Sequence, residues 1–220
     1  MSRFTTRRLA GAAAVLLLGA AVSGCSSGGG GRTGSAVPPA GVRGASYRLG
    51  TPPSAGGYAF HQAASASQQK MSDAEQQIAQ QLGITGTPVE ALYDDAADSE
   101  WIVFIGINAG SGGGFDPAQL HAKLWQQPST HLDGTGDRVT TSWEDTDPGP
   151  HGGRGICSQT LEQSGALAAE DSACLWMTAT TFGEVTFYPK GYSDRLLTGF
   201  TVVDAGNLMR AVRADVEQPL

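Results

Sequence analysis

Apolar side chains recur at a helical spacing in three segments of the chain. In the first segment, Ser72 is followed three residues later by Glu75, a pair typical of the capping box at a helix start. Gly83 then offers a residue that ends helices readily in the left-handed conformation. These signals predict a helix from residue 72 to residue 83. Its expected core-facing stripe is Ala74, Ile78 and Leu82.

Two further helices follow from similar signals. Asp116-Pro117 places a capping carboxylate and then a proline at the first helical position, so a helix should begin there and end before Pro128. The third helix is predicted from about Asp204 to Glu217. The expected inward-facing residues are Leu120 and Leu124 in the second helix and Leu208, Val212 and Val216 in the third.

Between the helices the pattern changes to that of strands. The run 101–105, Trp-Ile-Val-Phe-Ile, is apolar at every position, which indicates a central strand. The other expected strands are 58–63, a segment with alternating Val139, Thr141 and Trp143, and a hairpin of 173–180 and 184–188 joined at Phe182-Gly183. This order of elements is not a regular βαβ alternation. It predicts an α+β fold, a mostly antiparallel sheet with about three helices packed on one face.

The N-terminus has the pattern of an export signal. Arg3, Arg7 and Arg8 precede an apolar run, residues 9–22, of 14 residues, shorter than the about 20 that span a membrane. The run ends in Val22-Ser23-Gly24-Cys25, which resembles the lipobox of bacterial lipoproteins. That resemblance implies cleavage before Cys25 and a diacylglyceryl group on its thiol. An ordinary secretory signal or a short membrane anchor is the alternative, and Arg7-Arg8 leaves twin-arginine export open beside general secretion.

Composition separates a tether from a domain. Residues 26–56 are rich in Gly, Ser and Pro and poor in apolar side chains, which predicts a flexible coil with a root-mean-square span of about 30 Å. The expected organisation is therefore a signal peptide at 1–24, the lipidated cysteine and tether at 25–56, and a single extracytoplasmic domain at 57–220.

Charge follows the same division. The whole chain has a net charge of −7, yet residues 25–56 contain Arg32, Arg43 and Arg48 and no acid. From Gly57 onward, eight basic residues stand against 21 acidic ones, a net charge of −13. Nucleic acid and anionic headgroups repel so acidic a domain, so nucleic acid is not an expected partner and the membrane is one only through the N-terminal lipid. The three arginines either draw the tether to the membrane surface or are incidental.

The chain has three cysteines. With Cys25 assigned to the lipid, Cys157 and Cys174 remain as an even pair in an exported protein, which predicts a disulfide. The bridge would close a loop of 17 residues and stabilise the fold by about 3 kcal/mol in the chain-entropy model. Neither cysteine lies in a C-x-x-C arrangement, so we expect a structural bridge and not redox exchange or zinc binding.

Two kinds of loop raise the question of a ligand. The loop 110–114, Gly-Ser-Gly-Gly-Gly, lies between a strand and a helix as phosphate loops do, but no Gly-Lys-Ser/Thr follows and Asp116 is negative. Calcium is suggested by the acids Asp133 and Asp137 and by Glu144, Asp145 and Asp147. Neither group matches the spacing of a calcium loop, and Asp and Gly favour turns on their own account. We therefore assign no metal and no cofactor.

The histidines of the chain show no metalloprotease motif. The four histidines, His61, His121, His131 and His151, are far apart along the chain. The metalloprotease pattern His-Glu-x-x-His does not occur. Because catalytic triads assemble from distant residues, this weakens an enzymatic interpretation without ending it, and we assign no catalytic residue.

The most distinctive stretch of the domain is 147–153, Asp-Pro-Gly-Pro-His-Gly-Gly, which precedes Cys157 and is followed later by Cys174-Leu175-Trp176. Pro-Gly-Pro-x-Gly-Gly before one cysteine and Cys-x-Trp after it, together with the lipobox, resemble a group of exported, lipid-anchored actinobacterial proteins with no known activity. The resemblance covers about residues 147–188. Members of the group often have Ala-Asp after the tryptophan, where this chain has Met177-Thr178.

Three functional hypotheses follow. The leading one is a lipid-anchored binding or envelope-associated protein at the outer face of the cytoplasmic membrane, with an envelope protein or a small ligand as its partner. The second is an envelope hydrolase with an assembled Ser/His/Asp or metal site, which requires a pocket that gathers those side chains. The third is a lipid carrier, which requires an apolar cavity between the sheet and the helices.

Overall fold

The strand that is apolar on both sides forms the centre of a large antiparallel sheet. The computed structural model describes residues 46–95, 100–124, 129–165, 167–189, 196–197 and 200–220. In it, β5 (Glu100–Ala109) is flanked along nearly its whole length by β4 (Gly86–Asp95) and β10 (Thr181–Pro189). The predicted central strand is confirmed.

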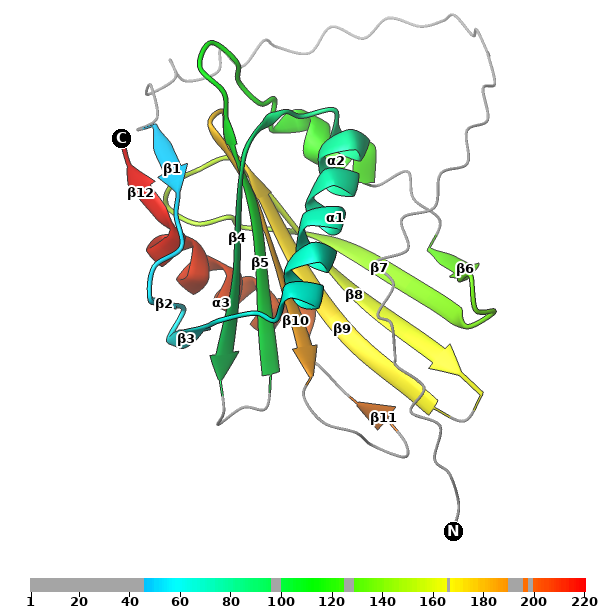
Figure 1. Ribbon diagram of the computed structural model, residues 1–220. Coiled ribbons are helices and arrows are strands. Elements are labelled where there is room, and N and C mark those ends of the chain that lie inside the picture. The colour runs from blue at the N-terminus through cyan, green and yellow to red at the C-terminus, as the bar shows by residue number, and fades with distance from the viewer. Residues whose placement is uncertain (1–45, 96–99, 125–128, 166, 190–195, 198–199) are drawn as a thin grey trace, which may run out of the picture. The chain divides into compact units, whose positions relative to one another are not determined.

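The sheet continues outward from this centre in the order β2-β3-β4-β5-β10-β9-β8-β7-β6 (Figure 1). Its other strands are β2 (Ser54–Ala55), β3 (Tyr58–His61), β6 (Thr130–Leu132), β7 (Arg138–Thr146), β8 (Arg154–Ser164) and β9 (Leu167–Met177). Neighbours on this path are antiparallel, and β11 (Leu196–Leu197) pairs with β9 in parallel. A separate two-stranded pair joins β1 (Tyr47–Leu49) to β12 (Glu217–Pro219).

The helices are α1 (Ser65–Leu82), α2 (Ala118–Leu124) and α3 (Val202–Val216). Successive strand residues point to opposite faces, so Phe104 and Trp176 pack toward α3, whereas Ile107 and Met177 pack toward α1 and α2. Figure 1 shows α1 in front of the sheet and α3 behind it. The α+β fold is confirmed, with helices on both faces and not on one, because a strand that is apolar on both sides needs cover on both.

The observed helix ends can be compared with the ends that the sequence predicts. Gly83 ends α1 in the left-handed conformation at φ 65°, as predicted, but α1 begins at Ser65, and Ser72 lies inside it with its hydroxyl bonded to Glu90. The capping carboxylate of Asp116 accepts the N–H of Ala118, as expected at the start of α2. Pro128 lies outside the described residues. Helix α3 begins slightly earlier than predicted, at a Thr201 cap that accepts the N–H of Asp204.

The hairpin of β9 and β10 turns at residues 178–180, and the Phe182-Gly183 pair lies inside β10. A Cβ on Gly183 would lie 2.2 Å from the Trp176 ring. Gly183 therefore makes room for the indole of Trp176. The sequence predicts a turn at this glycine, but it is a strand residue that packing requires.

The domain takes in part of the stretch assigned to the tether, because β1 and β2 lie between residues 47 and 55. Leu49 is buried and occupies the space above Gly106, where a Cβ would lie 2.5 Å from the leucine methyl. The expected signal peptide 1–24 and Cys25 lie outside the described residues. Within the described ranges, no helix has the length and apolar character that crossing a membrane requires.

Candidate functional site

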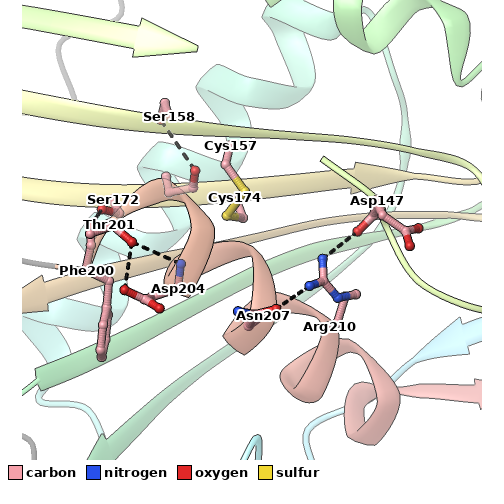
Figure 2. Close-up of a disulfide and its surroundings, with 11 residues drawn as sticks. Asp147, Cys157, Ser158, Ser172, Cys174, Phe200, Thr201, Asp204, Asn207 and Arg210 are labelled. Atoms are coloured by element: carbon pink, nitrogen blue, oxygen red, sulfur yellow. Dashed lines mark hydrogen bonds between the residues drawn. A yellow bond between two sulfur atoms is a disulfide. The ribbon is translucent and has the colours of Figure 1, made fainter. Parts of the chain in front are cut away.

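The predicted disulfide between Cys157 and Cys174 is confirmed (Figure 2). The two residues lie directly opposite each other on β8 and β9, with their Cα atoms 4.0 Å apart, and both are fully buried. Helix α3 packs on this bridge through Gly206, whose missing Cβ would lie 3.7 Å from the Cys157 sulfur. The disulfide therefore joins two strands at the point where the helix covers them.

Helix α3 is also tied to the loop that precedes β8. Figure 2 shows Arg210 of α3 between Asn207 and Asp147, where its Nη1 donates to the main-chain oxygen of Asp147 at 3.0 Å. One turn further on, Arg213 Nη1 donates to the main-chain oxygen of Pro148 at 2.7 Å. Two arginines of one helix thus hold consecutive carbonyl groups at the start of the loop 147–153.

The glycines of this loop are required by its backbone. Gly149, Gly152 and Gly153 have φ values of 98°, 69° and 94°, in the region that other residues rarely adopt. A Cβ on Gly153 would also lie 2.2 Å from the main-chain oxygen of Met177. The Pro-Gly-Pro-x-Gly-Gly stretch is therefore a bent segment that lies directly against the end of β9.

The side chain at the centre of this region is Glu217, which is 3% exposed. Its Oε1 accepts hydrogen bonds from the indole N–H of Trp176 at 2.8 Å and the hydroxyl of Thr181 at 2.6 Å. Its Oε2 accepts one from Arg213 Nε at 2.9 Å and lies 2.8 Å from His151 Nδ1. We call this residue with its four partners the Glu217 hub.

The donors of the hub decide the ionisation of its carboxyl group. Burial alone would raise the pKa of Glu217, but the charge of Arg213 and the hydrogen bonds from Thr181, Arg213 and His151 outweigh it and hold the pKa below its ordinary value. The buried Arg213 in turn has Glu217 as its counter-charge, and its guanidinium lies 5.7 Å from the Trp176 ring centroid. The hub is therefore an ionised, compensated carboxylate in the interior.

The hub collects the motifs that the sequence singled out. Trp176 belongs to the Cys-x-Trp pair, and His151 belongs to the Pro-Gly-Pro-x-Gly-Gly stretch. Sequence reasoning missed Glu217 and Arg213, although their four-residue spacing at the end of the predicted third helix is that of a helical ion pair. The contacts of Glu217 with Trp176, Thr181 and His151 have no signal in the sequence, because 36 to 66 residues separate the partners.

The structure places the four histidines on four different elements. His61 on β3 lies 3.9 Å from Asp94, and His121 on α2 lies 3.7 Å from Asp145. Both ring nitrogens of His131 on β6 are buried and have no hydrogen-bond partner among the described residues. His151 alone belongs to the hub. The histidines are thus not gathered into one centre in the part of the chain that the structure describes.

The acids considered for calcium lie at separate places. Asp133 and Asp137 share the hydroxyl of Thr135, at 2.8 to 3.0 Å, in the turn between β6 and β7. Glu162 of β8 joins them, so that one oxygen of each carboxyl group lies within 4.8 Å of the others. The hydrogen bond from Thr135, followed by the main-chain bond from Asp137, lowers the pKa of Asp133. Glu144 and Asp145 lie on β7 and Asp147 lies in the loop after it, apart from this cluster.

A second set of acids, which the sequence analysis did not single out, crosses the sheet on the face toward α1. Glu162, Asp171 and Glu184 occupy this face on β8, β9 and β10, and we call them the carboxyl row. Burial, then the charges of Glu162 and Glu170, raises the pKa of Asp171 to about 7. Burial, partly offset by a hydrogen bond from Thr186, raises the pKa of Glu184 to about 7. Strand alternation, applied across three strands, is the signal that could have found the row.

The glycine-rich loop 110–114 connects β5 to α2. Its Gly113 N–H donates to Gly110 O in a tight turn, and the Asp116 carboxylate at its end is occupied by the N–H of Ala118. The N–H of Ala118 at the start of α2, which a bound phosphate would need, is therefore bonded to an acid of this chain.

No protein-family model, no curated protein and no solved structure matches the chain.

Proposed function

We propose that this chain is a lipid-anchored extracytoplasmic binding protein at the outer face of the cytoplasmic membrane. The observation that carries the proposal is the pairing of Cys157 with Cys174. It leaves Cys25 as the one cysteine outside a disulfide, at the end of the lipobox-like Val22-Ser23-Gly24-Cys25. A buried disulfide suits an oxidising compartment, and an acylated cysteine supplies the two or more chains that stable anchoring needs.

The loop 147–153 is the binding surface that we propose. Its main chain is fixed by Arg210, Arg213 and the Glu217 hub, while Pro150 and Gly152 are exposed. A loop that is already fixed loses little conformational entropy when a partner binds, so its contacts contribute more fully to affinity.

The geometry favours binding over the two alternatives. A hydrolase whose metal is bound by several histidines needs them at one place, and the described histidines lie apart from one another. A lipid carrier needs a hollow between the sheet and a helix, and the space between the sheet and α3 is filled by large buried side chains such as Phe104 and Trp176.

Substitution of Cys25→Ser tests the anchor. We expect the variant to leave the membrane fraction or to remain as an uncleaved precursor, and mass spectrometry of the wild-type chain to show a diacylglyceryl group on Cys25. Ser27→Ala, two residues away, is the matched control and should be processed and anchored normally. Normal processing and membrane retention of Cys25→Ser would overturn the lipoprotein proposal.

Site-specific photo-crosslinking in growing cells tests the loop. A crosslinking amino acid at Pro150, on the loop, should give a discrete adduct, whether of a protein or of a small ligand. The same amino acid at Gln163, an exposed position on β8, serves as the control. Equal adducts at both positions, or none at Pro150, would remove the loop from the proposal and leave the anchor standing.

A further inference from the structure

Strand β1 is bonded along both of its edges although it lies outside the large sheet. On one edge it pairs with β12, so that Leu49 lies opposite Glu217. Main-chain bonds continue this pairing at both ends, from Gly50 N to Val216 O and from Leu220 N to Ser46 O, each 2.9 Å long.

The other edge of β1 is bonded by side chains in place of a neighbouring strand. The amide of Asn108 accepts the N–H of Leu49 at 2.7 Å and donates to its carbonyl oxygen at 3.2 Å. The hydroxyl of Thr180 bonds the main-chain N–H and carbonyl of Tyr47 at 3.4 and 3.1 Å. Every main-chain group of Tyr47 and Leu49 thus has a partner that a single substitution can remove.

The contacts of β1 lead directly to the loop 147–153. The ring of Tyr47 stacks on the ring of His151 with 4.0 Å between centroids and an interplanar angle of 17°. His151 is bonded to Glu217, and Glu217 belongs to β12, the partner strand of β1. The contacts therefore form a closed loop of interactions. Tyr47 of β1 stacks on His151, His151 is bonded to Glu217, and Glu217 lies on the strand that pairs with β1.

The far half of the loop 147–153 depends on these interactions. Arg210 and Arg213 hold the carbonyl groups of Asp147 and Pro148, at the start of the loop. Beyond them, the His151 side chain ties the loop to Glu217 and lies among three glycines with positive φ. Because glycine gains more backbone freedom than other residues when a restraint is lost, release of His151 should free the loop and not merely shift it.

We propose that β1 and the loop 147–153 form a latch, in which displacement of either segment loosens the other through His151 and Glu217. The residues before β1 lead back to Cys25, so the latch links the anchored end of the chain to the loop. A functional role for the latch, in which tension or a partner at the anchored end loosens the loop 147–153, rests on the proposed function. The coupling itself does not.

Hydrogen exchange of the full chain, followed by mass spectrometry, tests the latch. Tyr47→Ala should speed exchange at Gly152, whose N–H donates to Gly149 O, by about tenfold. Coupling free energies are reciprocal, so His151→Ala should speed exchange at Leu49 by a similar factor. Phe60→Ala, which removes another partly exposed aromatic from the edge strand β3, is the control and should change neither amide.

Exchange that rises in β1 alone for Tyr47→Ala, or in the loop alone for His151→Ala, would overturn the latch. Tyr47→Leu keeps the apolar bulk of the side chain and removes the stacked ring, so it replaces Tyr47→Ala if that variant does not fold. The same exchange measurement on Cys25→Ser separates the two proposals. The latch predicts unchanged coupling there, whatever happens to the anchor.

Discussion

The Glu217 hub and the carboxyl row lie on opposite faces of one sheet, and the pKa values of their acids move in opposite directions. Glu217 faces α3 and meets Arg213, His151, Trp176 and Thr181, all of which donate to it. Asp171 and Glu184 face the side of α1, where the charges that raise their pKa values are those of other carboxylates. Similar chemical groups on the two faces of one sheet therefore differ in ionisation, because Glu217 is ionised near pH 7 whereas Asp171 and Glu184 are about half protonated there.

The comparison shows that donors, and not burial, decide whether a buried carboxyl group stabilises the fold. Desolvation raises the pKa in both regions. In the hub, the Arg213 charge and the hydrogen bonds from Thr181, Arg213 and His151 surround a single acid and reverse this effect. In the row, strand alternation places acids of three strands on one face, and each one raises the pKa of the next.

The largest expected effect comes from removing the acid of the hub. Glu217→Ala leaves Arg213 buried without its counter-charge and three further donors without an acceptor, so we expect a loss of about 3–5 kcal/mol in the free energy of unfolding. Urea denaturation followed by Trp fluorescence measures it. Glu144→Ala, on an exposed position of β7, is the matched control. A loss below about 1 kcal/mol would mean that the hub does not stabilise the fold.

The disulfide supports both regions, because β9 contributes Trp176 to the hub and Asp171 to the row. Replacing both Cys157 and Cys174 by Ala should lower the free energy of unfolding by about 3 kcal/mol, since it frees a loop of 17 residues in the unfolded chain. Denaturation of the wild type with and without a reductant provides the check. Equal stability in the two states would show that the strand pairing and the packing of α3 hold β8 against β9 without help from the bridge.

The row should respond in the opposite sense to the hub. Asp171→Asn and Glu184→Gln remove a charge that the folded state ionises only near pH 7, so each should raise stability at pH 8 by about 2 kcal/mol. At pH 4 the wild-type groups are already protonated in the folded state, and the gain should be small. Thermal unfolding at the two pH values measures the difference. A gain of equal size at both pH values would show that the substitution acts through packing and not through charge.

The pH profile of the wild type should combine the two signs. The folded pKa of each row acid lies above its unfolded value of 3.8 or 4.5, so stability falls as pH rises from about 4 to about 7. The folded pKa of Glu217 lies below 4.5, so its contribution is present above that pH and is lost as pH falls through the folded pKa. We expect maximal stability near pH 4 to 5, just below the range in which the row acids begin to destabilise the fold. Glu217→Gln should remove the acid limb of the profile and leave the fall toward pH 7 in place.

More of the fold than of the candidate site could be predicted from the sequence, because the fold depends more on local signals. Helix stops, capping carboxylates and a strand without polar positions are local signals, and Gly83, Asp116 and the run 101–105 acted as predicted. Gly183 was misleading because its role depends on Trp176 on the neighbouring strand. The hub and the row depend on contacts between strands, and their residues become neighbours only when the register is known.

Glu162 gives the smallest effect and the sharpest test of how the row works. Burial, then the charges of Asp133 and Asp137, raises its pKa, but water reaches much of its side chain. We therefore expect Glu162→Gln to raise stability at pH 8 by only a few tenths of a kcal/mol. If the acids of the row repel one another, the gain from Glu162→Gln should be smaller in the Asp171→Asn background, because the repulsion between Glu162 and Asp171 is already absent there. A double-mutant cycle with no coupling would mean that burial at each position, and not repulsion between the acids of the row, raises their pKa values.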